Sequence, residues 1–251
     1  MAVWLFVATG LVSCGWWGSK SLPPAVDSLM AHMVTVEGGT FTMGATPEQK
    51  TDVRDDERPL HEVTLSTYAI GRYEVTQAEW VAVMGENPSE TEGDDLPVTN
   101  VSWEDCQQFI QRLNEMTGRK FRLPTEAEWG YAARGGKHAT GTAQFPGGQN
   151  NHKKVAWCFD NAGEKTHPVG RKEPNELGLY DMSGNVWEWC QDWYGDYSEE
   201  AVTNPRGPES GTERCDRGGA WDSTASSLRT SRRDCGDPAV RAVNMGFRLA
   251  E

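Results

Sequence analysis

Alternating apolar and polar residues near the start of the folded region predict extended strands. Residues 34–37 and 40–43 alternate in this way on either side of Gly38-Gly39. Two glycines between two such runs are typical of a two-residue β-turn, because glycine adopts positive backbone angles at little cost. We therefore predict a hairpin at this point, and further strands at 61–66 and 68–74.

Three helices are predicted between residues 76 and 135, because each carries a start signal. A hydroxyl residue at the cap is followed three residues later by a carboxylate, and the pair satisfies free backbone N–H groups: Thr76 with Glu79, Ser102 with Asp105, and Thr125 with Glu128. Glycines stand where these helices should end, at Gly85, Gly118 and Gly135. Beyond 135 the chain is rich in Gly, Asn, Pro and Trp, and only 246–250 again has a strand pattern. The pattern indicates an α+β fold with long irregular segments.

The N-terminus predicts a targeting segment. Residues 3–12 form an apolar run too short to span a membrane, and it leads into Leu-Val-Ser-Cys-Gly at 11–15. This junction resembles the lipobox of bacterial lipoproteins, with Cys14 as the lipidated residue. No Lys or Arg precedes the run, so this interpretation places the true start upstream; the alternative is a buried strand that ends in a chance cysteine. Residues 15–32, with Gly, Ser and Pro-Pro, are interpreted as a tether.

Composition and charge narrow the class of protein. The 251 residues include 11 Trp and 27 Gly, which indicates one loop-rich domain in which large aromatics supply much of the buried surface. The formal net charge is −13 and the pI about 4.9, so the long-range field repels phosphate backbones. No basic stripe with interleaved aromatics occurs, and a nucleic-acid partner is excluded.

The cysteines do not form a metal or redox motif. Apart from Cys14, five remain, an odd number that cannot all pair within one chain. Cys106 recurs at helical spacing with Ile110 and Leu113, so we expect it to be a small buried apolar residue. No pair of cysteines has the close spacing of a zinc or redox site.

Six motifs in chain order resemble the formylglycine-generating, or sulfatase-modifying factor, family. They lie at residues 33–44, 73–77, 96–103, 121–134, 175–189 and 217–221. Six motifs in sequence are far more specific than one short pattern. The resemblance covers about residue 33 to the C-terminus and implies an α+β domain of the C-type lectin-like fold, with small sheets, few helices and long ordered loops.

Enzymes of this family bind copper(I) through two cysteines that follow a serine, since soft thiolates suit that metal. The matching positions here are Ala220 for the serine, and Ser223 and Leu228 for the cysteines. A leucine cannot ligate copper, so we expect neither copper nor catalysis. The iron-dependent relatives need histidine ligands, and the five histidines of this chain show no ligand spacing.

The C-terminal region is more similar to the variable proteins of diversity-generating retroelements, which share this fold. Arg-Gly-Gly-Ala-Trp at 217–221 and Gly-Phe-Arg-Leu-Ala at 246–250 frame a block without strand or helix period. Between 222 and 244 the block lacks Lys, Glu, Gln, Met and Trp, the residues that adenine mutagenesis of asparagine codons does not produce.

Within a variable region of about 221–244, the resemblance implies thirteen diversified ligand-binding positions: Asp222, Ser223, Thr224, Ser226, Ser227, Asp234, Cys235, Gly236, Asp237, Val240, Ala242, Val243 and Asn244. The residues expected to be fixed are Trp221, Arg229, Arg233, Pro238, Arg241 and Phe247. The alternative interpretation is an ordinary surface loop of an enzyme relative that has lost activity.

One structural metal site is predicted by the resemblance. Asp181 and Glu188 offer carboxylate oxygens and Gly184 and Val186 offer main-chain carbonyls, a set suited to calcium. The alternative is that both carboxylates cap loops or pair with arginines.

We therefore expect a lipid-anchored protein of the bacterial cell envelope, on its outer surface, whose domain binds a protein or glycan of another cell or host. Its membrane contact is through the lipid alone. A formylglycine-generating oxidase, or an inactive relative, is the leading alternative, and a purely structural envelope lipoprotein is the third.

Overall fold

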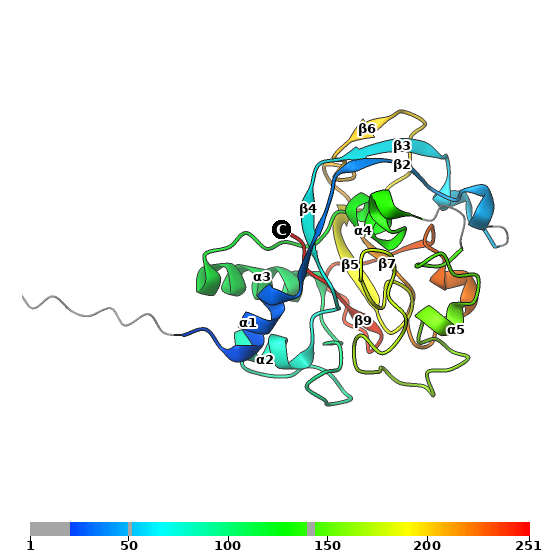
Figure 1. Cartoon of the computed structure of the whole chain (residues 1–251). Helices are drawn as coiled ribbons and strands as arrows, with labels where there is room; N and C mark the ends of the chain where they lie inside the picture. Colours follow the sequence, from blue (N-terminus) through cyan, green and yellow to red (C-terminus); the bar gives the residue numbers. More distant parts are fainter. Residues whose placement is uncertain (1–20, 50–51, 140–143) are drawn as a thin grey trace, which may run out of the picture.

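A long, bent two-stranded ribbon runs along one side of the molecule (Figure 1). The computed structural model describes residues 21–49, 52–139 and 144–251. Strand β1 (Met33–Val36) pairs antiparallel with β4 (Tyr68–Gly71), and β2 (Gly39–Met43) pairs antiparallel with β3 (His61–Leu65). The short strand β6 (Val202–Thr203) adds to β3 in parallel. The strands predicted at 61–66 and 68–74 are therefore confirmed, the second ending at Gly71.

The hairpin predicted at Gly38-Gly39 is wrong. β1 and β2 do not pair with each other, and neither glycine has a positive φ. The glycines are needed for close packing instead: a Cβ at Gly38 would lie 2.4 Å from the carbonyl oxygen of Leu65, and one at Gly39 would lie 2.4 Å from the hydroxyl of Tyr131. The chain reverses between β2 and β3, so the pairing partners of β2 come from a segment that is distant in sequence.

The three predicted helices begin at their predicted caps. They are α2 (Gln77–Met84), α3 (Trp103–Thr117) and α4 (Glu126–Ala133), and each has a capping box in which hydroxyl and carboxylate bond to the backbone reciprocally. Gly85 and Gly118 end α2 and α3 in the left-handed conformation, with φ of 95° and 70°. A short helix, α5 (His152–Val155), lies in the irregular region that follows.

The tether predicted over 15–32 is wrong in its second half. Pro24–Ala31 forms helix α1, which lies beside α2 and α3 at one end of the molecule (Figure 1). Val26 and Leu29 are buried against the same apolar cluster as Trp80. Eight residues give too short a window for a helical period, and tertiary packing is what stabilises such a helix. Cys14 lies outside the described residues.

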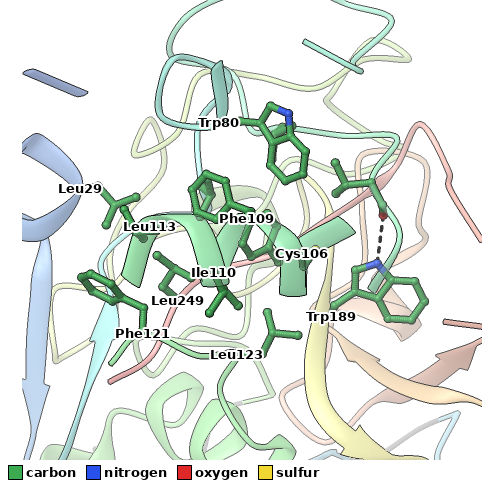
Figure 2. Packing of buried hydrophobic residues seen from close by; sticks show 14 of the residues in the cluster. Leu29, Trp80, Cys106, Phe109, Ile110, Leu113, Phe121, Leu123, Trp189 and Leu249 are labelled. Atoms are coloured by element: carbon green, nitrogen blue, oxygen red, sulfur yellow. Dashed lines mark hydrogen bonds between the residues drawn. The ribbon is translucent and has the colours of Figure 1, made fainter. Parts of the chain in front are cut away.

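A core cluster surrounds α3 (Figure 2). The rings of Trp80 and Phe109 stack with their centroids 5.2 Å apart, and Phe247 packs edge-on against both. The indole N–H of Trp189 donates to the carbonyl of Val101 at 3.1 Å, which satisfies its only polar group (Figure 2). Cys106 is fully buried in this cluster, as its spacing predicted.

A four-stranded sheet forms the centre and receives the C-terminal segment on both edges. Its order is β8 (Arg233–Gly236), β7 (Arg214–Arg217), β5 (Trp187–Trp193), β9 (Met245–Gly246). Of the strand predicted at 246–250, only the first residue belongs to β9, and Ala250 continues through isolated bridges to Ile70 and Arg122. Small sheets, few helices and long loops confirm the predicted α+β class. Within the described residues, no helix has the length and apolar character needed to cross a membrane.

Candidate functional site

The segment 221–244 leaves the central sheet after β7 and returns to it at β9. Its start is fixed where the N–H of Trp221 donates to the carbonyl of Asn185 at 2.9 Å. Its end is fixed where the N–H of Trp187 donates to the carbonyl of Asn244 at 2.8 Å. Between these points it contains one short 3-10 turn, Ala225–Leu228, and strand β8. The segment is therefore a largely irregular loop whose ends belong to the sheet.

Arg229 holds the middle of this segment through a buried ion pair. Its guanidinium forms two parallel hydrogen bonds of 2.6 Å to the carboxylate of Glu57, and the two side chains are 1% and 0% exposed. The remaining donors go to the hydroxyl of Ser231 and to the carbonyls of Asp52 and Ser226. All five N–H groups of the guanidinium are therefore used. The pKa of Glu57 is lowered: burial opposes its ionisation, but Arg229 and Ser231 outweigh that effect.

A second buried cluster joins β7 and β8 to the start of α4. Arg217 donates to Glu126 at 2.8 Å, and Arg233 donates to both oxygens of the same carboxylate at 2.9 and 2.8 Å. The phenol of Tyr197 adds a fourth hydrogen bond of 3.0 Å. Burial favours the neutral acid, yet the two guanidinium groups bring the pKa of Glu126 down to about 2.

The thirteen positions expected to vary all lie at least partly at the surface. Asp222, Thr224, Asp237, Val240 and Val243 are exposed, the other eight positions are half-buried, and none is buried. The stretch between them, 228–233, is buried throughout. Of the residues expected to be fixed, Arg229, Arg233 and Phe247 are buried, and Arg241 is exposed and paired with Asp105 at 2.7 Å.

Hydrogen bonds bring the two ends of the segment onto one face. The amide of Asn244 donates to the carboxylate of Asp222 at 2.9 Å, across 22 residues of sequence. The hydroxyls of Thr224 and Ser226 are 2.9 Å apart, and the Ser223 hydroxyl accepts from the N–H of Ala220 at 3.0 Å. Side chains from both ends of the block therefore lie together at the surface.

Phe159 adjoins this surface and was not found from the sequence. Its N–H donates to the carbonyl of Ser223 at 3.0 Å, and its side chain is 67% exposed. It lies between the motifs at 121–134 and 175–189, so no motif identified it. Only the tertiary contact with Ser223 reveals it.

The positions that match the copper site carry no pair of thiols. Ala220 and Leu228 are fully buried, and Leu228 packs in an apolar cluster with Phe145, Val155, Ala156 and Cys158. Burial raises the pKa of the Cys158 thiol, which disfavours the thiolate that a soft metal needs. The five cysteines of the described chain, Cys106, Cys158, Cys190, Cys215 and Cys235, are all reduced.

The predicted calcium ligands lie in a buried turn with an excess of carboxylates. Arg248 donates to both oxygens of Glu188 at 2.6 Å, so the predicted alternative of arginine pairing holds for this residue. Asp181 accepts from the N–H of Gly170 through Oδ2, while its buried Oδ1 has no partner among the described groups. Burial raises the pKa of the Glu74 carboxyl, and the nearby charges of Asp181 and Glu188 raise it further.

Side chains alone do not complete this site. Among the described residues, no group of three or more His, Cys, Asp or Glu side chains is arranged to hold a metal ion. Gly184 and Val186 are buried in the same turn, so their main-chain carbonyls would have to supply further ligands. The orphaned oxygen of Asp181 and the surplus negative charge are features that a divalent cation would satisfy.

A cavity of about 420 Å³ is lined in part by the segment that contains β6 and by Arg233. Its lining includes His61, Asp192 and Tyr197. Asp192 accepts from the N–H of Glu126 at 2.9 Å, and burial, together with the charge of Glu126, raises the pKa of Asp192 to about 7.

Comparisons with known proteins agree with this architecture. The family model described as the sulfatase-modifying factor enzyme 1-like domain matches residues 19–251. Chaperone protein LppX of Paenibacillus barcinonensis is 33% identical over 281 aligned positions, which cover 91% of this chain and 90% of that protein. The formylglycine-generating enzyme of Thermomonospora curvata is 34% identical and covers 87% and 92%. Among solved structures, Treponema denticola variable protein 1 has a TM-score of 0.78 at 32% identity, covering 87% of this chain and 94% of its own.

Proposed function

This chain belongs to the family of the sulfatase-modifying factor enzyme 1-like domain, and we propose that it is a ligand-binding member of that family without catalytic activity. Its binding face is formed by the thirteen surface positions of the segment 221–244. The similarity to Treponema denticola variable protein 1 supports a scaffold whose binding residues are diversified.

The observation that carries this proposal is the division between anchor and surface within one short segment. All the N–H groups of the Arg229 guanidinium donate to Glu57 or to neighbouring groups, and Arg233 is buried against Glu126. Loop backbones fixed in this way lose little entropy when a ligand binds, and side chains exchanged on them change the partner without repeating the ordering cost. A segment built like this can tolerate many side chains and keep one shape.

A formylglycine-generating oxidase is the second candidate, and the identity to the Thermomonospora curvata enzyme favours it. Ser223 and Leu228 occupy the two cysteine positions and argue against it, since leucine offers no ligand for copper(I) and a hydroxyl is a poor substitute for a thiolate. The two functions separate when the protein is incubated with copper(I), oxygen and a cysteine-containing sulfatase peptide. We expect no aldehyde by mass spectrometry; formation of aldehyde over repeated turnovers would overturn the binding-only function.

Diversification itself has a genetic test. We expect the genes of different isolates to differ mainly at the thirteen positions, with a near-copy of this region and a reverse-transcriptase gene nearby. Differences spread evenly along the chain, or identical C-terminal regions in all isolates, would contradict the proposal. The second result is what a purely structural envelope lipoprotein predicts.

We further propose that the domain is displayed at the outer surface of the bacterial envelope through lipid on Cys14, and that its partner is a macromolecule of another cell or host. Mass spectrometry of the N-terminal peptide from the native organism tests the anchor. An acylated Cys14 is expected, and an unmodified peptide that contains residues 1–20 would refute the anchor while leaving the proposed binding face unaffected.

Calcium at the Asp181 turn is proposed as a structural ion with no role in binding chemistry.

A further inference from the structure

Phe159 is the most exposed of the large apolar side chains in the described chain, at 67%. Its neighbours in the turn are the opposite: Cys158 and Ala162 are each only 1% exposed. An aromatic ring left in water forfeits the free energy that burial would give. Single exposed apolar side chains are common at protein surfaces, so it is the position of Phe159 beside the binding face that makes its exposure informative.

The turn that carries Phe159 is rigid. The N–H groups of Asn161 and Ala162 donate to the carbonyl of Cys158 at 2.9 and 2.8 Å. The side chain of Asn161 closes the same turn from inside, accepting from the N–H of Cys158 at 2.9 Å and donating to the carbonyl of Ala156 at 3.0 Å. The ring is therefore presented by a backbone that is already ordered, which lowers the entropic cost of using it in a contact.

Trp157, two residues before Phe159, fixes the turn to the domain. Its ring stacks on the ring of His167, with the centroids 3.7 Å apart. The ammonium of Lys172 lies 3.8 Å from the centre of the same Trp157 ring. The carbonyl of Trp157 accepts from the N–H of Asn185, and the carbonyl of Asn185 accepts from Trp221. The turn of Phe159 and the start of the segment 221–244 are thus held by one short chain of backbone bonds.

Phe159 also lies directly beside the exposed face. Its N–H is bonded to the carbonyl of Ser223, whose neighbour Asp222 is bonded to Asn244 at the far end of the segment. The face itself is mostly polar: its thirteen positions include exposed Asp222 and Asp237 and no Lys or Arg, and the exposed Arg241 of the same segment is paired with Asp105. An apolar ring next to a polar, acidic surface has the composition of an interface centre with its rim.

We propose that Phe159 is a constant apolar anchor of the binding face, which inserts into a recess on a folded polypeptide partner while the diversified residues around it select the partner. The inference rests on the proposed binding function. Phe159 lies outside 222–244, so exchange of the thirteen side chains leaves it in place. The acidic character of the face in this chain matches a partner whose recess is bordered by Lys or Arg.

The test uses a displayed library of the full chain in which the thirteen positions are randomised. Binders are selected against hen lysozyme, a basic folded protein, and in parallel against a maltoheptaose conjugate as a glycan probe. Phe159→Ser, Phe159→Leu and Met116→Ser are then introduced into each independent lysozyme binder. Met116, on α3, is 37% exposed and serves as the matched control for loss of an exposed apolar side chain.

In most lysozyme binders we expect Phe159→Ser to weaken the affinity about thirtyfold or more, the size of an interface hot spot. Phe159→Leu should retain most of the affinity, and Met116→Ser should change it less than about twofold. Lysozyme binders that tolerate Phe159→Ser would overturn the anchor. Dependence on Phe159 only among the glycan binders would overturn the polypeptide partner.

Failure of the proposed function gives a different result. In that case the library yields no binders to lysozyme or to the glycan, although its members still fold. Melting curves of each purified variant establish folding, and because Phe159 is mostly exposed we expect its substitution to leave the melting temperature nearly unchanged.

Discussion

Replacing Arg229 by alanine tests whether one buried ion pair fixes the shape of the binding segment. The substitution removes both 2.6 Å hydrogen bonds to Glu57 and leaves that carboxylate 0% exposed without its cation. Removing one partner of a buried pair costs about 3–5 kcal/mol, because the remaining charge is neither hydrated nor compensated. Domains are stable by only about 5–15 kcal/mol, so a large part of the margin would be lost.

Urea unfolding followed by tryptophan fluorescence measures this change. With an m-value of about 2 kcal/mol per molar, the midpoint should fall by about 1.5–2.5 M. Arg229→Lys keeps the charge but not the two parallel bonds, and we expect a loss of about 1.5–3 kcal/mol. Arg241→Ala is the control, since its pair with Asp105 is largely exposed on the arginine side and should cost under about 1 kcal/mol.

A double-mutant cycle with Glu57→Ala isolates the pair. If the pair acts as described, the double variant is less destabilised than the sum of the two single variants by at least about 2 kcal/mol, since neither charge is then left alone. A coupling energy near zero, or an Arg229→Ala variant within about 1 kcal/mol of the parent, would refute the reasoning. The segment would then be held by its backbone bonds alone.

Four further predictions concern other parts of the fold. The pKa of Asp192 is about 7 in the folded state, against an ordinary value near 3.8, so the fold favours the protonated carboxyl. The stabilisation from this proton is fully present below about pH 4 and is lost as the pH rises to about 7. Asp192→Asn should therefore match the parent at pH 4 and exceed its unfolding free energy by up to about 4 kcal/mol at pH 8; equal stability at both pH values would contradict this. The pKa of Glu126 is instead depressed to about 2, so its stabilising effect is present above its ordinary value of 4.5 and is lost as the pH falls from about 4.5 to 2. Urea midpoints of the parent should fall across that range while those of Glu126→Gln, already low, fall less, and parallel curves would exclude Glu126 as the cause. Gly184→Ala should cost more than about 2 kcal/mol, because φ is 78° and a Cβ would lie 2.1 Å from the Trp157 carbonyl oxygen, and a near-neutral change in the urea midpoint would show that the turn can yield. Removing calcium with a chelator should lower the melting temperature by several degrees, with recovery on adding calcium but not magnesium, and an unchanged melting curve would argue against the ion.

Local signals in the sequence were sufficient for the helices. Each capping box joins residues three positions apart, so the bonds from Thr76 to Glu79 and from Ser102 to Asp105 could be predicted without any knowledge of the tertiary fold. The family motifs supplied the fold class and the expectation that Arg229 is part of the fixed frame. The α1 helix was missed because its short apolar pattern gains stability only from packing against α2 and α3.

The sequence by itself determined the helix starts and the fold class, since these depend on nearby residues or on motifs in order, and it supplied the prediction of which C-terminal residues vary. The tertiary structure alone decided what those residues contact. The packing at Gly38, the Glu57 carboxylate 172 residues from Arg229, and the place of Phe159 beside Ser223 all depend on chain segments that are distant in sequence. Such contacts are chosen by the packing of the whole core, and no local pattern encodes them.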